Sequence, residues 1–122
     1  MKALTLTQPW ATLVACGAKR IETRSWYTHY RGPLAIHAAK SMTRYAEEFA
    51  MRERALGRNP GRLPKGCIVA TSRLVEVLPT TNVRYDISAL EQYYGDYTIG
   101  RWAWLPEDVV AFPEPIPCKG SL

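Results

Sequence analysis

The sequence predicts a small, mainly β, α+β domain in which five to six short strands form a closed or half-open barrel decorated by two to three helices. Two observations support this fold class. Short segments of alternating apolar and polar residues recur between turn signals, and two or three stretches with helical spacing lie among them. The 122 residues, 47% of them apolar, suit one core, and no repeat or linker divides them, so residues 1–122 are expected to form a single domain. An open antiparallel α+β sandwich is the alternative arrangement.

The first forty residues predict three strands and one helix. Residues 2–7 alternate apolar and polar side chains, as a half-buried strand does. Pro9 suits the first turn of a short helix over residues 10–16, because its missing N–H would be unpaired there anyway, and the glycine that follows is a natural stop. Residues 19–26 alternate again, and residues 34–38 are a compact apolar run, so both are expected to be strands.

The remaining residues predict a longer helix followed by further strands. Residues 42–56 have helical spacing, with Ser41 as a plausible cap and Gly57 as a stop. A loop over residues 58–65 and a long strand over residues 66–77 follow. The last expected elements are a short helix over residues 87–94, strands over residues 100–105 and 108–112, and a tail that Pro113, Pro115 and Pro117 keep extended.

The formal charge of +5 is concentrated in one segment. Between residues 19 and 44 there are six basic residues and one acid, Glu22, whereas the rest of the chain is close to neutral. A local excess of this kind is the electrostatic footprint of a phosphate-bearing partner, although a solvated surface with spare arginines gives the same count.

Several classes of protein are disfavoured by composition. No apolar run approaches the 20 or so residues of a membrane span, and the N-terminus lacks the features of a signal peptide, so we expect a cytoplasmic protein without a membrane partner. The three cysteines, Cys16, Cys67 and Cys118, are far apart. This spacing argues against a disulfide framework and a zinc site, and no metal or cofactor is expected.

Lys19, Glu22 and Arg24 are the first candidates for a site. Glu22 and Arg24 are two residues apart on a strand and therefore share a face, whereas Lys19 needs a bulge or loop to reach that face. A carboxylate, an ammonium and a guanidinium in one pocket can bind a polar ring with several donors and acceptors, or perform acid–base chemistry. A structural ion pair on an exposed sheet face is the alternative interpretation.

Aromatic and basic residues near this trio extend the candidate site. Trp26 and Tyr27 offer ring faces on which bases stack, and Arg31 can supply a phosphate contact. His37 points to the opposite face from its neighbours, either into a site or towards a hydrogen-bonded place beside the core. Lys40 ends the same strand where a backbone phosphate could be met.

These residues resemble the ASCH domain family, named for homology to activating signal cointegrator. The resemblance covers most of the chain and is most specific in its first forty residues. It is carried by the Gln8-Pro9-Trp10 turn, the G-x-K-x-x-E-x-R-S-W element over residues 17–26, the Arg31-Gly32 turn, the I-H-A-x-K strand end over residues 36–40, and later segments from Gly66 and from Tyr94.

The resemblance implies a PUA-like barrel that binds nucleic acid, mainly RNA, in a cleft holding the G-x-K-x-x-E-x-R residues. Some members are described as ribonucleases, and one branch hydrolyses acylated cytidine nucleosides. In that branch a lysine and a threonine three residues later belong to the catalytic group; here Lys19 matches the lysine, but Glu22 stands in place of the threonine.

Three functional hypotheses follow. The leading one is a module that binds RNA or a nucleotide-like ligand, with a nucleic-acid site at Lys19, Glu22, Arg24, Trp26, Tyr27, Arg31, His37 and Lys40. The second is a small hydrolase acting on RNA or on acylated cytidine, with Lys19 and Glu22 as the catalytic acid–base pair. The third is a protein-interaction domain of a larger assembly.

Overall fold

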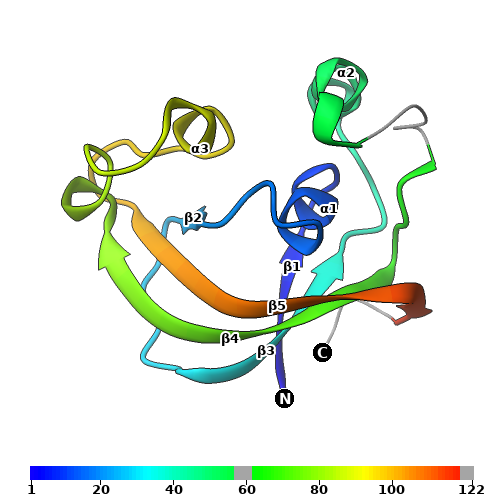
Figure 1. The fold of residues 1–122 in the computed structure, drawn as a ribbon, viewed down its shortest axis with the longest axis horizontal. Coiled ribbons are helices and arrows are strands. Elements are labelled where there is room, and N and C mark those ends of the chain that lie inside the picture. The colour runs from blue at the N-terminus through cyan, green and yellow to red at the C-terminus, as the bar shows by residue number, and fades with distance from the viewer. Residues whose placement is uncertain (57–61, 119–122) are drawn as a thin grey trace.

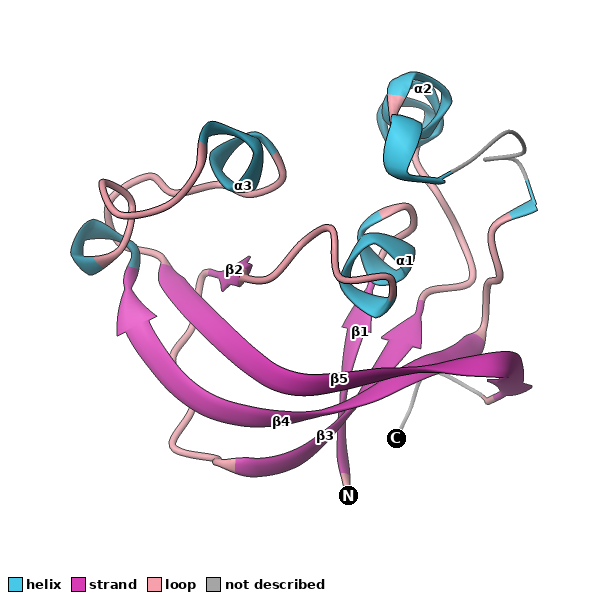
Figure 2. Cartoon of the chain, in the orientation of Figure 1, coloured by secondary structure: helices cyan, strands magenta, loops and turns pink. Residues whose placement is uncertain are grey.

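The computed structural model describes residues 1–56 and 62–118, which form a curved five-stranded sheet with three α-helices on its concave side (Figure 1; Figure 2). The predicted mainly β, α+β fold class is therefore confirmed. In the described residues, no helix has the length and hydropathy needed to cross a membrane. The elements in chain order are β1 Lys2–Leu6, α1 Trp10–Ala15, β2 Glu22–Arg24, β3 Gly32–Ala38, α2 Arg44–Arg52, the 3₁₀ turn η1 Arg54–Leu56, β4 Cys67–Pro79, the 3₁₀ turn η3 Thr80–Asn82, α3 Ala89–Tyr93 and β5 Trp102–Pro117.

The sheet has the strand order β1-β3-β4-β5-β2. β1 and β3 are parallel, and every other neighbouring pair is antiparallel. The long strands β4 and β5 pair along most of their length with three register shifts, which bend and twist them so that the sheet curls. Because β1 and β2 are the two ends of the strand order, the curl brings these edge strands towards each other (Figure 1).

The C-terminal strand differs from the prediction. Residues 100–105 and 108–112 were expected to be two strands followed by an extended tail, but one strand, β5, runs from Trp102 to Pro117. β2 covers only the first three residues of β5, and the following residues pair with β4 alone. Four prolines are tolerated on this strand because one side of it is an edge that needs no N–H donors.

Other elements are also shorter than predicted, among them α3 at Ala89–Tyr93, and local hydrogen bonds explain where β2 and α2 begin. The strand expected over residues 19–26 is reduced to β2, because the amides of Arg20 and Ile21 donate to the Glu91 carboxylate and leave the sheet pattern. Helix α2 begins after Thr43, whose hydroxyl accepts from the Ala46 amide, rather than after Ser41. The predicted stop at Gly57 and the first half of the predicted loop over residues 58–65 lie outside the described residues.

The apolar core has two parts that matter for the site. The main cluster joins the concave face of the sheet to α1, with Leu6, Val14 and Leu74 among its members. A smaller cluster joins the three helices through Leu13, Phe49 and Tyr94. The helices therefore pack on one another above the sheet and leave a hollow between themselves and the two edge strands.

Candidate functional site

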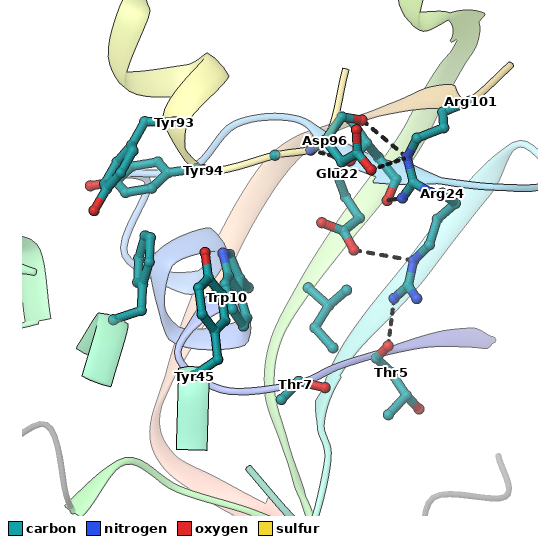
Figure 3. Close-up of a pocket in the computed structure, with 14 residues that line it drawn as sticks. Thr5, Thr7, Trp10, Glu22, Arg24, Tyr45, Tyr93, Tyr94, Asp96 and Arg101 are labelled. Atoms are coloured by element: carbon teal, nitrogen blue, oxygen red, sulfur yellow. Dashed lines mark hydrogen bonds and ion pairs between the residues drawn. The ribbon is translucent and has the colours of Figure 1, made fainter. Parts of the chain in front are cut away.

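A pocket of about 430 Å³ opens where the edge strands β1 and β2 face each other beneath the helices (Figure 3). One side of it is aromatic and the other is charged (Figure 3). Its lining residues are Thr5, Leu6, Thr7, Trp10, Glu22, Thr23, Arg24, Tyr45, Phe49, Tyr93, Tyr94, Gly95, Asp96 and Arg101.

The structure brings the predicted trio of Lys19, Glu22 and Arg24 together. Glu22 Oε1 lies 3.4 Å from Lys19 Nζ, and Glu22 Oε2 lies 3.1 Å from Arg24 Nε, an ion pair without hydrogen-bond alignment. The chain that leaves α1 turns Lys19 to the Glu22 side, because the Lys19 amide donates to the Leu13 carbonyl. Lys19 is only 1% exposed and its ammonium also donates to the Ile21 carbonyl, so it supports Glu22 from behind.

Arg24 joins the two edges of the curled sheet. Its Nη2 donates to the carbonyl of Thr5, 2.5 Å away on β1, while Arg24 itself belongs to β2. We call the place where the edge strands β1 and β2 face each other, which this hydrogen bond crosses, the barrel seam. Burial lowers the pKa of the Arg24 guanidinium, Glu22 raises it and Arg101 lowers it; because an arginine pKa starts so high, the group stays charged. The barrel is thus half-open and is bridged at its seam by one side chain.

A second ion pair completes the charged side of the pocket. Arg101 Nε lies 3.5 Å from Asp96 Oδ2 and donates to the Asp96 carbonyl, and Arg101 Nη2 donates to the Thr23 carbonyl. The hydroxyl and amide of Thr98 donate to Asp96 and hold the pKa of that carboxyl below its ordinary value. Two guanidiniums and two carboxylates therefore line the pocket, and their formal charges balance.

The aromatic side consists of rings from all three helices and the residue after α3. Trp10 stacks on Tyr45 with ring centroids 6.4 Å apart, and Phe49 stacks on Tyr93 with centroids 5.0 Å apart. Tyr94 packs against both Phe49 and Tyr93. Tyr45 is 64% exposed and Tyr93 is 56% exposed, so both present open ring faces at the rim.

Three predicted site residues form a separate group that does not line this pocket. Trp26 is half-exposed, packs edge-on against Trp104 and lies under the Arg24 guanidinium at 5.3 Å. Tyr27 is exposed and lies 5.8 Å from the Arg31 guanidinium, which is ion-paired with Glu76. Arg24 is thus the link between the pocket and this outer aromatic surface.

His37 and Lys40 also lie outside the pocket. His37 is 1% exposed; its Nδ1 is 3.2 Å from the Thr5 hydroxyl and its Nε2 is 3.0 Å from the Cys118 carbonyl. It therefore holds Thr5, a pocket residue, from the far side of β1. Lys40 is exposed, and its side-chain stem passes close to Gly66.

Sequence reasoning missed most of the aromatic side and the second ion pair. The sequence pattern indicates a core position for Trp10 and an apolar helix face for Tyr45 and Phe49; Phe49 is buried as that pattern predicts, whereas Tyr45 is 64% exposed. The spacing of four residues between Tyr45 and Phe49 does place them on one helix face, and this was the available signal. The Asp96–Arg101 pair carried no signal, because their roles depend on a loop that folds back onto Thr23.

The described residues contain no group of three or more His, Cys, Asp or Glu side chains arranged to hold a metal ion. Cys16 and Cys67 are free thiols.

Two buried tyrosines beside the site predict a loss of stability at alkaline pH. Burial raises the pKa of Tyr94 and of Tyr97, and the nearby carboxylates Glu53 and Glu91 add to this effect. Above about pH 10 the unfolded chain releases phenolic protons that the folded chain retains, so the unfolding free energy falls by about 1.4 kcal/mol per pH unit for each tyrosine. Urea unfolding between pH 9 and pH 11 measures this slope.

The matched control for this slope is an exposed tyrosine. Replacing both buried tyrosines by phenylalanine should flatten the alkaline slope, whereas Tyr85→Phe should leave it unchanged. An equally steep loss in the double variant would show that other groups cause it.

Comparison with known proteins agrees with this geometry. The family model of the ASCH domain matches residues 4–114. Activating signal cointegrator 1 of Homo sapiens and of Mus musculus are 38% and 37% identical over 81 residues, a match that covers 62% of this chain and 14% of each relative. The chain thus spans about one seventh of the length of these curated relatives.

Solved structures give the same fold. The crystal structure of ASCH from Zymomonas mobilis matches with a TM-score of 0.57 at 16% identity, covering 94% of this chain and 71% of that chain. A mutant of the same protein also matches with a TM-score of 0.57, covering 73% of that chain. With its family model matched across nearly its whole length, the chain belongs to the ASCH domain family.

Proposed function

We propose that this domain binds single-stranded RNA or a nucleotide-like ligand and takes one unstacked base into the pocket at the barrel seam. The observation that carries the proposal is the pocket's composition: a continuous set of aromatic rings faces a polar side of two guanidiniums and two carboxylates. A nucleobase has the same two requirements, since its faces stack and its edges present donors and acceptors together.

The balance of charge favours a base over a polyanion as the occupant of the pocket. Each lining guanidinium already has a carboxylate partner, Glu22 for Arg24 and Asp96 for Arg101. Among these described ion pairs the only excess charge is that of Lys19, which is buried behind Glu22. A carboxylate acceptor beside guanidinium donors instead suits the mixed hydrogen-bonding edge of a base. Lys19 and Arg24 fix the orientation of Glu22 before any ligand arrives, which lowers the cost of ordering the site.

Residues outside the pocket extend the proposed interface. Trp26 offers an exposed ring next to Arg24 and Tyr27 offers one next to Arg31, and Arg31 and Lys40 supply positive charge on the surface. In this proposal they contact neighbouring nucleotides of the same strand, with His37 acting indirectly by holding Thr5. Binding should weaken with added salt, because neutralising phosphates releases counterions.

The alternative of a hydrolase assigns acid–base chemistry to Lys19 and Glu22. Lys19 is buried behind Glu22 and is not among the residues that line the pocket, and its ammonium is engaged with the Glu22 carboxylate and the Ile21 carbonyl. This supports a positioning role for Lys19 and favours binding over turnover.

A stacking variant tests the proposal. Tyr45→Ala should weaken binding of a short single-stranded RNA about tenfold, because one base–aromatic stack contributes about 1–3 kcal/mol. Fluorescence anisotropy with labelled RNA at low salt measures the affinity.

Met51→Ala is the matched control, because Met51 is an equally exposed large side chain on α2 that does not line the pocket. The proposal fails if wild-type protein shows no affinity for single-stranded RNA, nucleotides or nucleosides at low salt, or if the two variants bind alike.

A further inference from the structure

A second pocket of about 460 Å³ adjoins the first, and Gly95 belongs to the walls of both. At this residue the shared wall is bare backbone: a Cβ on Gly95 would lie only 3.0 Å from the Tyr97 ring. The first and second pockets are therefore neighbours, separated at this point by the Gly95 backbone with the Tyr97 ring packed against it. The other residues lining the second pocket are Arg84, Tyr85, Gln92, Tyr97 and Thr98.

Arg84 gives this second pocket a net positive charge. It is the one charged residue among the described lining residues, and in the described part of the chain it forms no ion pair. Its Nη2 donates to the Tyr85 hydroxyl, 3.1 Å away, and its carbonyl accepts from Gln92 Nε2 at 2.8 Å. These hydrogen bonds hold the Arg84 backbone and guanidinium in place, and no carboxylate among the residues that the structure describes pairs with the guanidinium.

The two pockets differ in what their arginines can do. Arg24 and Arg101 are each ion-paired and each donate to a backbone carbonyl, so the first pocket has no guanidinium to spare. A nucleotide needs a cation for its phosphate as well as a place for its base, and guanidinium is the side chain best suited to phosphate. Arg84, in the neighbouring pocket, is an arginine that pairs with no described carboxylate and can serve as the cation for the phosphate.

We infer that the second pocket binds the phosphate group of the nucleotide whose base occupies the first pocket, with Arg84 as the phosphate ligand. This inference rests on the proposed function. Tyr85, which is 81% exposed, holds the guanidinium at the rim through its hydroxyl and its ring, 5.0 Å from Arg84 Cζ. The phosphate is the shared chemistry of a free nucleotide and of an RNA backbone.

Calorimetry with nucleosides and nucleotides tests the inference. Wild-type protein is titrated with the four ribonucleosides, with their 5′- and 3′-monophosphates, with a short single-stranded RNA, and with inorganic phosphate as a competitor. One monophosphate series should bind about tenfold more tightly than its nucleoside, as expected of a charge-assisted hydrogen bond. Arg84→Gln should abolish this preference while leaving nucleoside affinity unchanged. Inorganic phosphate should compete with the nucleotide and not with the nucleoside.

The titration with single-stranded RNA distinguishes a free nucleotide from an RNA backbone as the source of the phosphate. A loss in Arg84→Gln for free nucleotides and RNA alike supports one subsite that serves both. Arg73→Gln is the matched control, because Arg73 is an exposed arginine on β4 that lines neither pocket. Urea unfolding midpoints should be equal for the two variants.

Two outcomes overturn the inference in distinguishable ways. If nucleosides bind and Arg84→Gln keeps the preference for phosphate, or if Arg31→Gln removes it instead, the second pocket is not the phosphate site and the proposed function stands. If neither nucleosides, nucleotides nor RNA bind the wild-type protein, the proposed function fails and the inference fails with it.

Discussion

Glu22→Gln should lower the unfolding free energy by about 3 kcal/mol, although the two side chains are nearly isosteric. The carboxylate of Glu22 lies between Lys19 Nζ and Arg24 Nε, at 3.4 and 3.1 Å. An amide compensates neither cation, and Lys19 is too deeply buried for water to take over. Removing one partner of a buried pair is costly because it leaves the other charge unpaired. Urea unfolding at pH 7 measures the loss.

Two further variants show whether charge is the cause. Adding Lys19→Met to Glu22→Gln removes the stranded ammonium and keeps an apolar chain of similar length, so the double variant should recover much of the lost stability. Glu48→Gln removes an exposed partner of Arg44 on α2 and should leave the unfolding midpoint unchanged. If Glu22→Gln unfolds at the wild-type midpoint, the buried trio does not stabilise the fold.

The part of the site that the sequence predicted is the part that depends on local geometry. Glu22 and Arg24 share a strand face because side chains alternate, and the structure places both in the pocket. Lys19 required a departure from alternation, which the hydrogen bond from its amide to Leu13 provides. The sequence alone left its direction open, because a loop can turn a side chain either way.

The part that was not predicted depends on the curl of the sheet. Arg24 on β2 reaches Thr5 on β1 because the sheet curls where β4 and β5 bend through their register shifts, and Asp96 and Arg101 reach Thr23 because their loop folds back onto it. The alternation of these segments predicts strands but not how far the shifts curl the sheet. The two alternatives for His37 were a site and a hydrogen-bonded place beside the core, and the structure shows it buried with its Nδ1 near the Thr5 hydroxyl.

Arg24→Ala should both open the barrel seam and weaken ligand binding. The guanidinium provides the described hydrogen bond across the seam, to the Thr5 carbonyl, and it pairs with Glu22 in the same pocket. Losing a hydrogen bond from a charged donor together with a half-buried ion pair should cost about 2–4 kcal/mol of unfolding free energy. RNA affinity should fall at least about tenfold, because Glu22 loses the contact that orients it and the polar side of the pocket loses a donor.

Hydrogen exchange separates a local opening from a general loss of stability. β2 pairs with β5 over three residues and β1 pairs with β3 over five, so each edge strand has a strand partner on one side only. In Arg24→Ala their amides should exchange faster than those at the centre of β3 and β4 by more than the change in global stability explains. Arg24→Lys keeps the charge but cannot reach Thr5 and Glu22 together, so it should retain much of the stability and little of the binding.

Two other outcomes for Arg24→Ala would contradict the prediction. If Arg24→Ala accelerates exchange uniformly across all five strands, Arg24 stabilises the domain as any half-buried ion pair does, and the seam is held by the packing of α1 on the sheet. If exchange at β1 and β2 rises alone while RNA affinity is unchanged, the base is bound away from the polar side of the pocket. Only a joint loss of edge protection and of affinity supports one side chain both bridging the half-open barrel and shaping the pocket at its seam.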